Sequence, residues 1–118
     1  MKQITARDAE QWENWLQAHH DSVDEVWIRV AKKASGIPSV QPAEATEVAL
    51  CFGWIDSHRR AGDETTYLQR YSPRRRGSRW SALNIAAARR LIATGRMRPA
   101  GLAAFERRPP LSEHDPSA

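Results

Sequence analysis

Cysteine is nearly absent from this 118-residue sequence, which holds one, Cys51. A single cysteine excludes an intrachain disulfide and is typical of a reducing compartment, so we expect a cytoplasmic protein. No apolar run approaches the roughly 18 residues that a membrane-spanning helix needs. The first fifteen residues also lack the apolar core of a signal peptide. We therefore expect neither a membrane span nor an export signal.

The motifs of several kinds of active site are missing too. There is no C-x-x-C, no H-E-x-x-H, no G-x-S-x-G and no glycine-rich phosphate loop. The adjacent His19 and His20 point to different faces of a helix, so they are poorly placed to share an ion. We predict no metal, no cofactor and no catalytic residue, which favours a binding protein over an enzyme.

The composition is that of a soluble globular protein, with 41% apolar and 27% charged residues. The length fits one domain with one core. We expect this domain to cover residues 1–108 and the tail over 109–118 to be disordered.

Charge is distributed unevenly along the chain. Residues 1–57 hold nine acidic residues against five Lys or Arg, whereas residues 58–98 hold eleven arginines against only Asp63 and Glu64. A segment of this kind favours an anionic partner. The alternative is a solvated basic surface that complements the acidic first half of the chain.

Hydrophobic spacing predicts an α+β fold. Helices are expected from Thr5, as N-cap, to about His20, from Gln41-Pro42 to Phe52, over 82–94 after Ser81, and from Pro99 to about Arg107. Strands are expected over about 25–31 and in a hairpin, Trp54 to Arg60 and Thr65 to Tyr71. We therefore predict a small, mainly antiparallel three-stranded sheet packed with about four helices.

The hairpin brings polar residues together. Alternation places Trp54, Asp56, His58 and Arg60 on one face of the first strand. Pairing about a four-residue loop then puts Asp56 near Gln69 and Arg70. Asp56 is expected to pair with Arg70 or to brace an arginine of the following loop, either as a structural ion pair or as part of a site.

The stretch SPRRRGSRWSALN, residues 72–84, offers an anion site. The first turn of the helix after Ser81 has free N–H groups and a partial positive charge. Guanidinium groups nearby would add charge-assisted hydrogen bonds. Trp80 either stacks on a planar ligand or anchors the loop to the core, and Asn84 either binds ligand or holds the loop. The candidate ligand-binding residues are Trp54, Asp56, Arg70, Arg74, Ser78, Arg79, Trp80, Ser81 and Asn84.

Five stretches carry a family resemblance: WENWLQAHH, VWIRVAKK, EVALCFGWIDSHRR, YLQRYSPRRRGSRWSALN and LIATGRMRPAGLAAF. Over roughly residues 10–105 they resemble the YdeI/OmpD-associated, or bacteriocin-protection, family. The resemblance implies an α+β fold related to the YjbR and bacterial frataxin-like groups, and an association with resistance to antimicrobial peptides or bacteriocins. It supplies no settled catalytic residues. The iron-binding acidic ridge of frataxin-like proteins has only a scattered counterpart here, in Asp8, Glu10 and Glu13.

These observations lead to one functional hypothesis and two alternatives. We expect a non-enzymatic bacterial protein of a stress or resistance type that holds an anionic or planar ligand, nucleic acid included, at the hairpin and arginine-rich loop over 54–84. The first alternative is a small enzyme using Asp56 or His58 with an arginine clamp. The second is an interaction module for an acidic protein partner.

Overall fold

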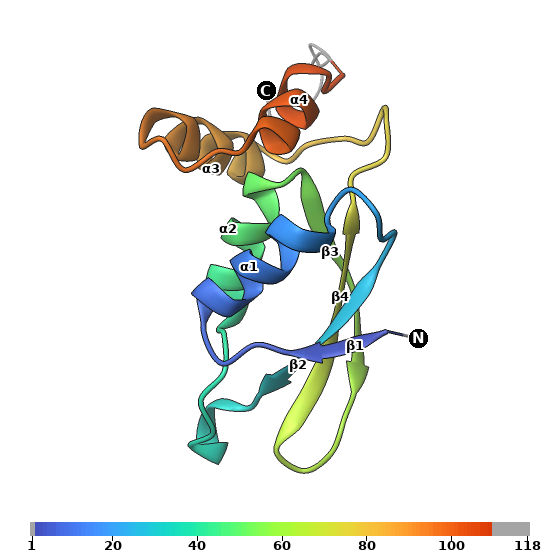
Figure 1. Ribbon diagram of the computed structural model, residues 1–118, viewed down its shortest axis with the longest axis vertical. Coiled ribbons are helices and arrows are strands. Elements are labelled where there is room, and N and C mark those ends of the chain that lie inside the picture. Colours follow the sequence, from blue (N-terminus) through green and yellow to red (C-terminus); the bar gives the residue numbers. More distant parts are fainter. Residues whose placement is uncertain (1, 110–118) are drawn as a thin grey trace.

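The computed structural model describes residues 2–109, so the tail predicted to be disordered lies outside the described residues except for Pro109. Four α-helices, one short 3₁₀ helix and four strands make an α+β fold (Figure 1). Their order is β1 (Gln3–Thr5), α1 (Ala9–His19), β2 (Val26–Ala31), η1 (Lys33–Ser35), α2 (Pro42–Cys51), β3 (Trp54–Ala61), β4 (Thr66–Pro73), α3 (Ala82–Ala93) and α4 (Pro99–Glu106).

The sheet has four strands in the order β1-β2-β4-β3, which corrects the predicted three. β2, β4 and β3 are antiparallel as expected, whereas β1 runs parallel to β2 and makes the sheet mixed. β1 has only three residues, too few for a period-two pattern, so its pairing with β2 defines it. Because Thr5 belongs to this strand, it is not the N-cap of α1. That position is Asp8, whose side chain accepts the Gln11 N–H at 2.9 Å.

The helix α2 follows the predicted pattern closely. Pro42 occupies its first turn, where a missing N–H costs nothing. Gln41 and Glu44 form a capping box, with the Glu44 side chain accepting the Gln41 N–H at 3.3 Å. Gly53 follows the helix with φ +76°, a left-handed conformation that glycine adopts without strain. The chain can therefore turn directly from α2 into β3.

The core lies between the sheet and the helices α1 and α2, which cover one face (Figure 1). Val26, Ile28 and Val30 of β2 point into it. Trp12 of α1 is fully buried and donates its indole N–H to the Ala45 carbonyl of α2 at 2.9 Å. Cys51 is buried as well, and desolvation raises the pKa of its thiol.

The opposite face of the sheet, the open face, has no helix of residues 2–109 over it (Figure 1). Trp27 and Leu68 point to this face, since they alternate with core residues and lie outside the core cluster. They are nevertheless only 6% and 4% exposed. The guanidinium of Arg60 lies over the Trp27 ring, 5.2 Å from its centroid, so this side chain covers part of the apolar surface.

Candidate anion-binding site

A groove of about 810 Å³ lies where β3 begins and β4 ends, against the loop that connects β4 to α3. β4 brings Arg70 to one wall, and the glycine-containing loop forms another. Gly77 has φ +82°, so the loop reverses there without strain. The groove is lined by Asp24, Ile55, Ser57, His58, Arg70, Ser72, Pro73, Arg74, Arg75, Arg76, Gly77 and Ser78.

The charge of this lining is strongly positive. Four arginines line the groove, and Asp24 is the single acidic residue among the lining residues. Within residues 2–109, no carboxylate lies within ion-pairing distance of Arg74, Arg75 or Arg76. Arg75 and Arg76 are also exposed. The groove therefore attracts anions, with a field that added salt screens.

Arg74 is the most constrained of these arginines. It is only 5% exposed, and its guanidinium lies over the Trp80 ring at 3.8 Å from the centroid. One long hydrogen bond, 3.5 Å, runs from Nη1 to the Arg79 carbonyl, and Nε has no partner within the described chain. Burial lowers the pKa of Arg74 to about 10, while the charge of Asp56 opposes that shift. Arg74 is thus a desolvated cation with few compensating contacts.

Arg70 is held by a network on the open face. Its Nε and Nη2 donate to one carboxylate oxygen of Glu25 at 3.0 and 2.8 Å. Its Nη1 donates to the hydroxyls of Ser57 at 2.9 Å and Ser72 at 3.3 Å. The hydrogen bond and charge of Arg70 lower the pKa of Glu25. Glu25 therefore neutralises the charge of Arg70 on the β4 wall of the groove. The loop arginines that line the groove have no such carboxylate partner within residues 2–109.

Asp56 does not form the pair with Arg70 that alternation predicts. A bulge inserts one extra residue between Asp56 and Arg59, so Asp56 lies opposite Tyr71 on the helix side of the sheet. Arg70 points to the open face with Trp27. Arg60 lies on the open face too, whereas Trp54 is in the core, because the bulge reverses the alternation. Asp56 affects the loop in another way, because its negative charge raises the pKa of Arg74.

The structure brings three of the predicted site residues, Arg70, Arg74 and Ser78, to the groove. Trp54 and Trp80 are buried, 2% and 5% exposed, so the core covers their rings. The predicted residues that do not line the groove are Trp54, Asp56, Arg79, Trp80, Ser81 and Asn84.

Ser81 and Asn84 act at the start of α3. Ser81 is the N-cap, and its hydroxyl accepts the Asn84 N–H at 3.1 Å. This contact already satisfies one of the free N–H groups on which the predicted anion site depends. Ser78 is the last residue of the chain that lines the groove. The loop arginines therefore line the groove, whereas the start of α3 does not.

Several arginines of the basic segment pair with the acidic first half of the chain. Arg96 contacts Glu47 at 2.8 Å, and Arg98 contacts Glu13 at 3.1 Å. Arg90 also approaches Glu47, at 3.8 Å. These pairs fit the structural alternative, and they join the α3–α4 region to α1 and α2. The basic segment thus includes arginines around the helices that pair with carboxylates, and loop arginines that line the groove.

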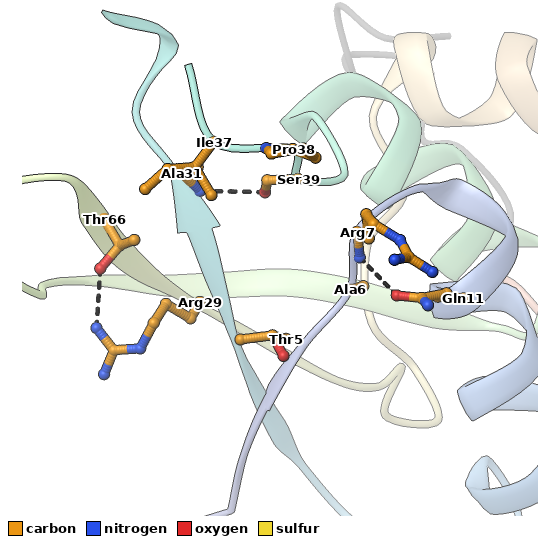
Figure 2. A pocket seen from close by; sticks show the side chains of 10 residues that line it. All are labelled: Thr5, Ala6, Arg7, Gln11, Arg29, Ala31, Ile37, Pro38, Ser39 and Thr66. Atoms are coloured by element: carbon orange, nitrogen blue, oxygen red, sulfur yellow. Dashed lines mark hydrogen bonds between the residues drawn. The ribbon is translucent and has the colours of Figure 1, made fainter. Parts of the chain in front are cut away.

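Sequence reasoning missed Glu25, Ser57 and Ser72, which surround Arg70. Ser72 lies two residues after Arg70 in the same strand, so alternation was an available signal for that hydroxyl. Sequence reasoning also missed a second cavity, about 440 Å³, between the end of β1 and the segment after η1 (Figure 2).

No group of three or more metal-ligating side chains occurs within residues 2–109, and no helix there is long and apolar enough to span a membrane.

In the comparison with protein families, a family model matches residues 4–104. The matching family is described as a domain of unknown function, DUF8412. Neither the curated proteins nor the solved structures contain a match to this chain. The family description names no activity, so the resemblance to YdeI/OmpD-associated proteins stays a prediction. Since the match spans nearly the whole described chain, the protein is a member of the DUF8412 family.

Proposed function

We propose that this protein is a non-enzymatic, cytoplasmic binding protein that holds an anionic ligand in the groove beside the 74–78 loop. The observation that supports this most is Arg74, a buried cation with no carboxylate partner within the described chain. Removing a cation from water without a counter-ion costs free energy. An anion in the groove would recover part of that cost, beyond what the contact with the Trp80 ring provides.

The donors available in the groove define how the ligand is held. Arg75 and Arg76 supply exposed guanidinium groups, and Ser78 supplies a hydroxyl. These groups suit phosphate, sulfate or carboxylate oxygens. His58 is the only aromatic ring among the lining residues. We therefore favour recognition through charge and hydrogen bonds over stacking of a planar ligand.

Calorimetric titration with inorganic pyrophosphate at low salt tests this proposal. We expect saturable binding that weakens as salt is added, because the loop arginines are exposed. The double variant Arg75→Gln/Arg76→Gln should lose affinity at least about tenfold, or 1.4 kcal/mol. Arg89→Gln/Arg107→Gln is the matched control, since both residues are exposed and neither lines the groove. Equal losses in both variants, or no binding, would refute a specific site.

Nucleic acid is one version of the anionic ligand. Anisotropy with labelled single-stranded DNA and RNA at about 50 mM salt separates this version from small-anion binding. Binding of the oligonucleotides that depends on Arg75 and Arg76 would support it. Pyrophosphate binding without oligonucleotide binding would restrict the ligand to small anions.

The resistance role rests on the resemblance to the YdeI/OmpD-associated family and is proposed on that basis alone. Deleting the gene should then increase sensitivity to cationic antimicrobial peptides, and a groove variant should fail to restore resistance.

The two alternatives remain predictions: an enzyme using Asp56 or His58, and a module for an acidic protein. His58 lines the groove and Asp56 does not, so the two residues proposed for an enzyme do not face the same cavity.

A further inference from the structure

The second cavity is separate from the groove and shares no lining residue with it. Figure 2 shows its walls: the end of β1 and the start of α1 on one side, β2 and Thr66 of β4 on another, and the segment after η1 above them. Its volume of about 440 Å³ lies within the range of small-molecule sites. The lining residues are Thr5, Ala6, Arg7, Gln11, Arg29, Ala31, Ile37, Pro38, Ser39 and Thr66.

Hydrogen bonds hold the wall formed by Ile37, Pro38 and Ser39 in place. The Ser39 hydroxyl accepts the Ala31 N–H at 3.0 Å, which joins the segment to β2 (Figure 2). The next residue, Val40, donates its N–H to the Ala6 carbonyl at 2.9 Å and is itself fully buried. These bonds attach the segment to β2 and to the end of β1. The cavity is therefore already formed in the protein, so ligand binding need not order a loop.

One side of the cavity is apolar. Ala6, Ala31, Ile37 and Pro38 supply this surface. Ile37 is 48% exposed. An isolated exposed apolar side chain is ordinary on a protein surface. Here it borders a cavity with other apolar groups, which gives a ligand's hydrocarbon body a surface to bury.

The polar side of the cavity is cationic. Arg7 and Arg29 line it, and none of its lining residues is acidic. Arg29 is already engaged by Thr66 at 2.8 Å, by Gln3 at 3.0 Å and by Asp63 at 3.6 Å. The side chain of Arg7, in contrast, has no ion pair or hydrogen bond within residues 2–109. Arg7 is thus the cation that remains available to a ligand.

Gln11 adds a second donor beside Arg7. Its side-chain oxygen accepts the Arg7 backbone N–H at 2.7 Å, and this bond fixes the amide group (Figure 2). The oxygen is therefore occupied, while the amide NH₂ is left to donate. A carboxylate has two oxygens, so it can accept one hydrogen bond from Arg7 and one from Gln11.

We infer that this cavity binds a small amphipathic carboxylate, with the hydrocarbon body against Ile37 and Pro38 and the carboxylate at Arg7 and Gln11. This inference is independent of the groove, because the two cavities have no residue in common. The recognition requires both parts of the ligand: an apolar body for the wall and one negative charge for the arginine.

Amide NMR titration with 2-naphthoate and its neutral analogue 2-naphthalenemethanol tests the inference. The naphthalene ring should shift the amides of Ala6, Arg7, Ala31 and Ser39 saturably. The carboxylate should bind at least about tenfold more tightly than the alcohol. Arg7→Gln should reduce the affinity for 2-naphthoate to that of the alcohol. Ile37→Ser should weaken both probes, because the apolar wall serves both.

Two control variants keep the test specific. Arg89→Gln removes an exposed arginine of α3, and Leu83→Ser removes a side chain that is 84% exposed on the same helix. Both lie outside the cavity and should bind 2-naphthoate as the parent protein does. Absence of saturable shifts, shifts confined to the groove, or equal affinity for the acid and the alcohol would each overturn the inference.

Discussion

The guanidinium of Arg74 lies 3.8 Å from the centroid of the Trp80 ring, and both side chains are at least nine-tenths buried. Trp80 in turn packs edge-on against Phe105 of α4, with 5.6 Å between the ring centroids. Together, these two contacts join Arg74, directly after β4, to the last helix. It also brings a positive charge into a partly apolar environment at the wall of the groove.

The replacement Arg74→Met separates a ligand-binding role from a packing role. Methionine is flexible and apolar, so it can remain against Trp80 without a buried charge. Replacing a poorly compensated buried charge is often neutral or stabilising by about 1–4 kcal/mol. We expect the free energy of unfolding in urea to be unchanged or higher, while the affinity for pyrophosphate falls at least about tenfold. A clear loss of stability with unchanged affinity would assign Arg74 to packing alone.

The replacement Glu25→Gln should increase anion affinity. Glu25 neutralises Arg70 at the groove wall, and a glutamine in its place can still accept a hydrogen bond without the charge. Arg70 then adds to the positive field of the groove, so pyrophosphate should bind several-fold more tightly at low salt, with a smaller gain at high salt. Asp21→Asn, on an exposed residue that does not line the groove, is the control. Equal gains in both variants would mean that net charge alone is responsible.

Asp63 should make stability depend on pH in the acid range. One of its oxygens accepts hydrogen bonds from the backbone N–H and the hydroxyl of both Thr65 and Thr66, at 2.8–3.2 Å. These bonds lower the pKa of Asp63 to about 2. Because the folded pKa is below the unfolded value of about 4, this stabilisation is complete above pH 4 and is lost as the pH falls towards 2.

Thermal melts between pH 2 and 5 check this expectation. Asp63→Asn should lower the melting temperature at pH 5 and make the profile flatter below pH 4. Glu64→Gln is the matched control, since Glu64 is the exposed neighbour in the same turn and forms none of these bonds. A parallel profile for Asp63→Asn and the parent protein would contradict the assignment.

The replacement Gly101→Ala should destabilise the protein, although alanine normally favours a helix over glycine by about 1 kcal/mol. A Cβ at this position of α4 would lie closer than 3.0 Å to the Cys51 carbonyl group and the Met97 sulfur. The backbone of α2 cannot move easily, so we expect a loss of about 1–3 kcal/mol in urea unfolding. Ala103→Gly, on the exposed side of α4, should cost only about 1 kcal/mol. A stabilised Gly101→Ala variant would mean that α4 is not held closely against α2.

Local sequence signals were enough for most of the elements. The apolar spacing of Trp12, Trp15 and Leu16, and Pro42 after Gln41, predicted helices that the structure confirms. These signals work because helix spacing and capping involve residues within a few positions of one another. β1 had no such signal, since its three residues become a strand through pairing with Trp27, Ile28 and Arg29 of β2.

For the candidate site, the sequence by itself determined that arginines gather beside a turn between β4 and a helix. Tertiary structure alone decided which of them meet a cavity. The bulge after Asp56 moved that carboxylate away from Arg70, and Glu25, 45 residues earlier, took its place. Ion pairs and cavities depend on strand register and on contacts between distant segments. Charge composition is set residue by residue, whereas the partner of each charge is set by the fold.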